Sequence, residues 1–393
     1  MTKQPATETA HSSGFALWNL GFRPFYLLAS IFSVFSVLLW AAQFSGLVPA
    51  VYLSDPLWHG HEMLFGYTTA IIAGFLLTAV RAWTNQPTPS GMPLMGLAAL
   101  WVAGRVLVLT PFAMTSAIAN AAFPIAVGLA IAIPLWQSRN TRNYFFAGLL
   151  VVMGILIFTM HMAMQGRLAL SPRLGLQLEL DLVLFIMIVM GGRVIPMFTN
   201  NGIPGTNAIR HALVERIALG SVILLFAIDL LQLPQVVAAV IALTACLAHA
   251  WRLYLWKPWR TRATPLVWIL HAAYAWIVVY LLLRGLTSLG LLAGSYAVHA
   301  LTVGAIGGLT LGMMTRTARG HTGRLLVADG FERTMFLLIQ LAAVIRVFGG
   351  IASPGFYIAS TQLSGVIWAV AFGLYAVRYW PVLTRPRLDG KPG

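Results

Sequence analysis

The chain has 393 residues, of which 59% are apolar and only 9% are charged. Soluble domains carry roughly 25% charged residues, and no polar stretch here is long enough to fold alone, so this composition excludes a soluble protein. With a mean hydropathy of +0.83, it predicts an all-α, polytopic integral membrane protein. The formal charge of +15 does not indicate a nucleic-acid partner, because the basic residues lie in short segments between apolar spans.

The first 23 residues are polar and then mildly amphipathic. They lack the charged start and the small-residue cleavage site of a signal peptide, so we expect a short cytoplasmic tail. The single cysteine, Cys246, lies inside an apolar span. One cysteine excludes a disulfide within the chain and a cysteine-based metal motif.

Twelve segments are long enough to cross a bilayer, which takes about 20 apolar residues. Pro234 interrupts one long apolar run and is expected to split it into a tight hairpin. The predicted spans are 24–46, 58–80, 92–110, 112–136, 144–164, 176–199, 213–233, 234–256, 265–285, 293–313, 334–350 and 356–380.

Lysine and arginine gather at the N-terminus and in alternate loops, which is the positive-inside pattern. Both termini are therefore expected in the cytoplasm, with 24–380 as one transmembrane domain and 381–393 as a C-terminal tail. Arg167 and Arg173, after the fifth span, are exceptions. We see no strong internal repeat, although a six-plus-six arrangement is possible. Residues 314–333 are predicted to form the only sizeable inner loop.

With this orientation, polar residues of five spans lie at a similar depth near the outer face. Ionisable groups within a membrane are expensive and usually functional, although outer-layer charges also extend to the headgroups in ordinary packing. The stretch WHGHEM supplies three of them at the start of the second span. The whole set is His59, His61, Glu62, Arg105, His161, Glu179, Asp181 and His299.

Four histidines in one layer favour haem or metal ligation, since neutral imidazole suits copper, iron and haem. Met160 and Met164 flank His161 and would add soft thioether ligands for Cu(I), or they are simple core packing. His59 and His61 would point about 200° apart on a regular helix, so either Gly60 loosens the turn or only one of them is a ligand.

The three outer carboxylates, Glu62, Glu179 and Asp181, are candidates to orient the imidazoles or to carry protons. We assign them a catalytic role in proton delivery from the outer side.

Near the inner face, His249 and His271 fall on adjacent predicted spans at matching depth. They would suit a bis-histidine haem, but two lone histidines bonded to neighbouring helices give the same pattern. Arg193 lies close to the inner end of its span and is either an interfacial arginine or a partner for a haem propionate. His321 lies between glycines in the inner loop, where a structural and a regulatory role are both open.

Three long motifs in this chain resemble the NnrS family: WHGHEMLFGYTTAIIAGFLLTAV, GGRVIPMFT and HALTVGAIGGLTLGMMTRTARGHTGR. The resemblance covers essentially the whole chain. It implies a polytopic bacterial protein with haem and copper that is associated with denitrification and nitric oxide tolerance. Through these motifs it marks as functional positions His59, His61, Glu62, Arg193, His299, Arg316 and His321.

The favoured hypothesis is a protein of the bacterial inner membrane that carries b-type haem and copper and removes nitric oxide as an oxidoreductase. Quinol or a periplasmic carrier would donate electrons. A transporter is the first alternative, because twelve spans with both termini inside is a common transporter layout. A haem or copper sensor or store without catalysis is the second.

Overall fold

The computed structural model describes residues 14–44, 46 and 55–391. Most of the predicted N-terminal tail, residues 1–13, lies outside the described residues. Helices form the described chain in the order α1 Phe22–Phe44, α2 Asp55–His61, η1 Glu62–Thr68, α3 Thr69–Thr84, α4 Met92–Leu107, α5 Ala113–Gln137, η2 Thr141–Asn143, α6 Tyr144–Met164, α7 Pro172–Gly202, α8 Ala212–Leu230, α9 Gln235–Leu255, η3 Pro258–Thr261, α10 Pro265–Ser288, α11 Gly294–His299, η4 Ala300–Gly307, α12 Gly308–His321, α13 Gly330–Ala352, η5 Pro354–Phe356 and α14 Tyr357–Thr384.

The all-α membrane fold expected from the sequence is confirmed. Ten helical segments in the described part of the chain are long and apolar enough to cross a membrane. The shorter α4 and the more charged α8 occupy the positions of two further predicted spans. All twelve predicted spans therefore coincide with helices, and the protein is a multi-pass membrane protein.

The predicted inner loop 314–333 is too long, because α12 continues to His321 and α13 already begins at Gly330. Hydropathy falls where arginines appear, but arginine, methionine and alanine are good helix formers. The helix therefore continues beyond its apolar part. For the same reason α14 continues to Thr384.

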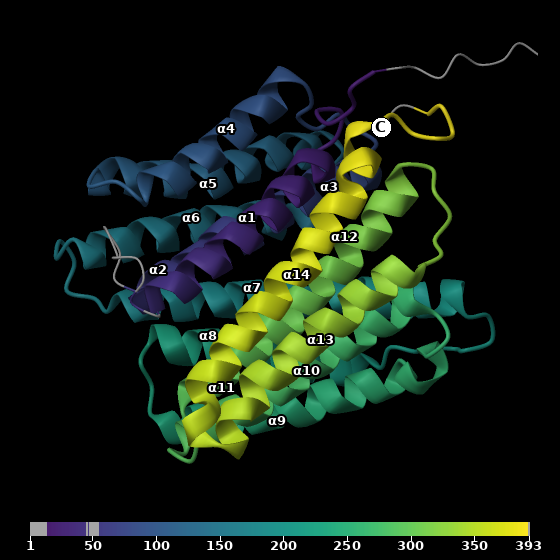
Figure 1. Ribbon diagram of the computed structural model, residues 1–393. Helices are drawn as coiled ribbons and strands as arrows, with labels where there is room; N and C mark the ends of the chain where they lie inside the picture. The colour runs from purple at the N-terminus through teal and green to yellow at the C-terminus, as the bar shows by residue number, and fades with distance from the viewer. Residues whose placement is uncertain (1–13, 45, 47–54, 392–393) are drawn as a thin grey trace, which may run out of the picture.

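α7 lies between α6 and α8 in Figure 1 and packs against α6, α8 and α10, while α1 packs directly against α14. The two ends of the described chain meet at one face, where the backbone N–H of Ala16 donates to the carbonyl of Thr384 at 2.8 Å. This is the face that the basic residues predict to be cytoplasmic. The opposite face is called outer below.

Two helices contain a π-helical segment, and each segment directly follows a candidate histidine. η1 begins after His61 and η4 begins after His299. These are the two π segments of the described residues. π segments are rare and are frequent at functional sites. We call residues 55–84 the first histidine helix and residues 294–321 the second histidine helix.

The two histidine helices share a sequence pattern that the composition hides. Each has glycine five and thirteen positions after its histidine and arginine twenty positions after it: Gly66, Gly74 and Arg81 in the first, Gly304, Gly312 and Arg319 in the second. Their glycines also meet one neighbouring helix in the same register. Side chains at Gly66 and Gly74 would collide with Phe32 and Phe25 of α1, and side chains at Gly304 and Gly312 with Trp276 and Ile269 of α10.

Helices α1–α5 and α10–α14 therefore form two related units. In each unit the helix after the histidine helix carries a buried arginine, Arg105 in α4 and Arg346 in α13. Each arginine bonds the helix that follows, through Asn120 of α5 or Tyr357 of α14. The sequence alone showed no strong repeat, because most of the matching positions in the two units carry different residues.

Candidate functional site

The first candidate site is a buried group that we call the closed cluster, formed by His61, Glu62, Arg105, Asn120 and His161. The Nε2 atoms of His61 and His161 lie 2.9 Å apart, although α2 and α6 are far apart in sequence. Both imidazoles are fully buried. The sequence prediction that His61 and His161 share one outer site is thus consistent with their placement.

Glu62 joins His61 to Arg105 of α4. His61 donates from Nδ1 to Glu62 Oε1 at 2.7 Å, and Arg105 Nη1 donates to the same oxygen at 2.8 Å. With Nδ1 protonated, His61 directs the lone pair of Nε2 towards His161. A carboxylate that fixes the tautomer of an imidazole is the usual outer partner of a metal-binding histidine.

Arg105 is in turn fixed by α5. Its Nη2 donates to Asn120 Oδ1, and Asn120 Nδ2 donates to the carbonyl of Ser116 at 2.8 Å. A buried ion pair is stable only when its remaining donors and acceptors are satisfied. These contacts supply that satisfaction for most of the guanidinium.

The second candidate site is a cavity of about 480 Å³ between the two histidine helices and the outer ends of α1, α7, α13 and α14. We call it the histidine cavity. His59 and His299 both line it, with ring centroids 6.5 Å apart and planes only 10° apart. Trp40 stacks on His59 at 4.2 Å between centroids. Trp368 and Phe44 add aromatic walls.

The tautomer of His299 is set by its own helix. Its Nδ1 donates to the carbonyl of Ser295 at 2.7 Å, which leaves the lone pair on Nε2. His59 Nδ1 is buried and has no hydrogen-bond partner among the described residues. His299 Nε2 and the unbonded His59 Nδ1 are therefore available to a group in the cavity.

His59 and His61 face different sites, a division that the sequence left open. His61 belongs to the closed cluster, whereas His59 faces the histidine cavity. Gly60 lies against Leu176 of α7, where a Cβ would be too close to the leucine side chain. Glycine at this position permits close packing of α2 on α7 and does not turn both imidazoles to one side.

Glu179 and Asp181 lie in α7 but in different surroundings. Asp181 accepts from Arg284 Nη1 at 2.8 Å, and Arg284 also bonds Asp229 at 2.5 Å, so this carboxylate belongs to an ion network of α7, α8 and α10. Glu179 is fully buried, and neither of its oxygens has a hydrogen-bond partner in the described part of the chain. A buried polar group without a partner costs about 1–3 kcal/mol, which marks Glu179 as a functional candidate.

The two inner histidines bond different partners and do not face a common space. His249 contacts Tyr274 Oη at 2.6 Å and the carbonyl of Ala218, whereas His271 Nε2 lies 2.8 Å from Thr199 Oγ1. This arrangement matches the alternative of single histidines bonded to neighbouring helices. It offers no support for the bis-histidine haem predicted near the inner face.

The remaining candidates of the inner side also lie apart from both sites. Arg193 donates to Asn143 Oδ1 at 2.7 Å, and the guanidinium of Arg316 lies 3.9 Å from the ring centroid of Phe198. His321 packs near Phe22, and its carbonyl accepts from Arg387. These contacts join the inner ends of the helices.

The methionines beside His161 are part of the packing. Met160 is buried against Gly175 of α7, and Met164 packs with Trp58 and Val108. Among the described residues, no group of three or more His, Cys, Asp and Glu side chains is placed to hold a metal ion. The candidate outer imidazoles lie in two pairs, His61 with His161 and His59 with His299.

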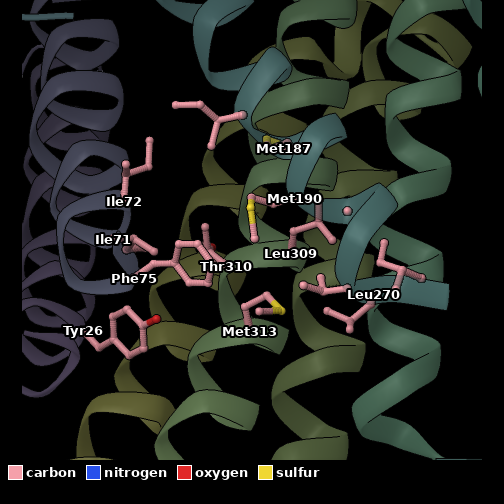
Figure 2. Close-up of a pocket in the computed structure, with 14 residues that line it drawn as sticks. Tyr26, Ile71, Ile72, Phe75, Met187, Met190, Leu270, Leu309, Thr310 and Met313 are labelled. Atoms are coloured by element: carbon pink, nitrogen blue, oxygen red, sulfur yellow. The ribbon is translucent and has the colours of Figure 1, made fainter. Parts of the chain in front are cut away.

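A third space is a small apolar cavity of about 100 Å³ between α1, α3, α7, α10 and α12. Figure 2 shows Ile71 and Phe75 on one side and Met187, Met190, Leu309 and Met313 on the other. Its one threonine, Thr310, already bonds Tyr67 Oη at 2.6 Å. A cavity of this kind stays dry and accepts small apolar molecules.

Sequence reasoning did not identify Arg346, Trp40 or Asn120. Arg346 is 4% exposed inside an apolar helix, and a search for every intramembrane charge would have found it. Trp40 and Asn120 have no such signal, because a tryptophan near a helix end and an asparagine among small residues are ordinary in membrane helices.

The profile of the NnrS protein family matches residues 16–387. The chain belongs to this family. Membership connects it with the response to nitric oxide and agrees with its many apolar helices. A search of curated proteins finds no match.

Proposed function

We propose that this protein is a haem–copper membrane protein of the bacterial inner membrane that binds nitric oxide and removes it. The histidine cavity is the observation that carries the proposal. It offers two nearly parallel imidazoles, a fixed His299 tautomer and aromatic walls within about 480 Å³. An imidazole ligand, aromatic walls and a cation that can pair with a propionate suit a haem site.

His299 would hold b-type haem through its free Nε2, with His59 in the wall of the same cavity, and His61 with His161 would hold copper. Imidazole suits copper. Glu62 orients His61 in the way that a carboxylate orients a metal-binding histidine. The two Nε2 atoms lie 2.9 Å apart, so the two imidazoles would offer both nitrogens to one copper ion. Bound haem iron would supply the place where nitric oxide binds, and copper would supply an electron.

The chain's own residues provide access and protons. Nitric oxide is uncharged and enters the lipid phase, and the apolar cavity of Figure 2 gives it a dry place between the histidine helices and α7. Glu179 has no partner that would hold its proton in place, so we assign it the transfer of protons from the outer side. Asp181 is held by Arg284 and is given a structural role instead. Quinol or a periplasmic carrier would supply the electrons.

An anaerobic optical spectrum of the purified protein, reduced and with or without nitric oxide, tests this function. We expect a Soret band that shifts when nitric oxide is added, and a loss of nitric oxide that is slower in Glu179→Gln at unchanged haem content. A colourless, metal-free protein, produced with haem and copper supplied, would contradict the proposal and favour a transporter. A Soret shift without consumption of nitric oxide would reduce the function to binding.

A further inference from the structure

Arg346 is a buried cation without the carboxylate partner that Arg105 has in the first unit. In the first unit, Arg105 pairs with Glu62, the residue after His61. In the second unit, the residue after His299 is Ala300. Among the described residues, Arg346 forms no ion pair with an Asp or Glu, and its Nη1 has no hydrogen-bond partner.

Arg346 is nevertheless held firmly and lines the histidine cavity. Its Nη2 donates to Ser295 Oγ at 3.1 Å and to Tyr357 Oη at 3.3 Å, and its guanidinium lies over the Tyr357 ring. Only 4% of the residue is exposed. A buried charge without a counter-ion is strongly unfavourable, so a fixed guanidinium that lines the histidine cavity implies an anionic group from outside the chain.

We propose that Arg346 binds a carboxylate of the ligand that occupies the histidine cavity, in the role that Glu62 has towards Arg105. The inference rests on the proposed function, under which this carboxylate is a haem propionate. A guanidinium pairs with a carboxylate through two parallel hydrogen bonds. His59 Nδ1, which also lines the cavity and lacks a partner, gives the site a further polar atom.

Arg173 extends the same argument to the mouth of the cavity. It lines the histidine cavity from the start of α7 and is exposed. It is one of two arginines that break the positive-inside pattern. Arg173 would meet a second carboxylate in solvent, where the gain is small, while Arg167 lies in the same outer loop outside the cavity lining.

The test compares haem with its dimethyl ester, in which both carboxylates are blocked. Full-length protein is produced in a haem-deficient host, purified in detergent and titrated with each form, and binding is followed by the Soret band. We expect wild type to bind the diacid about 10- to 100-fold more tightly than the diester. Arg346→Gln should reduce this preference by about tenfold or more, Arg173→Gln by much less, and Arg167→Gln not at all.

An equal preference in wild type and Arg346→Gln would overturn the assignment. Size-exclusion chromatography checks that each variant is folded. If Arg346→Gln does not fold, Arg346→Lys keeps the charge without the planar fork and should still show a reduced preference, and an unchanged preference would overturn the assignment.

If neither form of haem binds folded wild type, the proposed function fails separately from this inference. Titration with acetate then tests whether the cavity binds a carboxylate at all. Tryptophan fluorescence follows the binding, because Trp40 and Trp368 line the cavity. Saturable quenching that Arg346→Gln abolishes would support an anion site whose ligand is a free carboxylate. Its absence would overturn the site.

Discussion

The two histidine helices have similar backbones, but the buried arginine beside the first has a carboxylate partner and the one beside the second has none among the described residues. Both carry a histidine before a π segment, and both pack their glycines on one neighbouring helix in the same register. In the first unit Glu62 neutralises Arg105, and His61 contacts His161 directly, so the space is closed. In the second unit Ala300 replaces the glutamate, and Arg346 and His299 face a cavity. Under the proposed function, the first unit would hold a small ion and the second would face a large ligand.

Removal of the two arginines should separate the two units most strongly. Arg105→Leu leaves Glu62 buried without its guanidinium and should lower the free energy of unfolding by about 3–5 kcal/mol. Arg346→Leu removes a cation that has no internal carboxylate, so in ligand-free protein it should cost clearly less. Denaturant titrations of both variants in detergent measure the difference. Equal losses would contradict the account of the two charge environments.

The second prediction concerns the role of Glu62. Glu62→Gln keeps the size of the side chain but weakens its hold on His61 Nδ1, so copper affinity should fall about 10- to 100-fold. Copper retained after dialysis against a graded chelator measures this change. The Soret band should keep its position and intensity, since His59 and His299 are untouched. Copper affinity equal to that of wild type would leave Glu62 as a partner of Arg105 alone.

The third prediction converts the second unit towards the first. Ala300→Glu places a carboxylate at the position that corresponds to Glu62, so the loss of stability should be smaller with Arg346 present than in an Arg346→Gln background. Neighbouring residues of this kind couple by about 0.5–3 kcal/mol. A double-mutant cycle on thermal stability measures the coupling. A coupling of zero would show that the two units do not correspond at this position.

Much of this fold was predictable because hydrophobic length and basic residues report directly on membrane spans. All twelve spans were placed, and depth predicted one outer layer that contains His61 and His161 without pairing them. The division of His59 and His61 between two sites was left open, since it depends on the packing of Gly60 against α7. The bis-histidine haem at His249 and His271 finds no support because depth alone does not say which way a ring points.

The repeat escaped prediction for a related reason. Only the histidine, two glycines and one arginine are shared along each histidine helix, and these become visible when the π segments and the contacts with α1 and α10 are compared. Arg346 carries the same lesson. A search for every intramembrane charge would have found Arg346, but the missing carboxylate at Ala300 becomes visible only when the two units are compared.

The most direct test of the two-site account is the iron and copper content of three purified proteins, wild type, His299→Ala and His161→Ala, with His211→Ala as a control in an exposed loop. The account predicts that His299→Ala loses haem iron and keeps copper, that His161→Ala loses copper and keeps the Soret band, and that the control matches wild type. Loss of both metals in either variant, with the protein still folded, would contradict two separate sites.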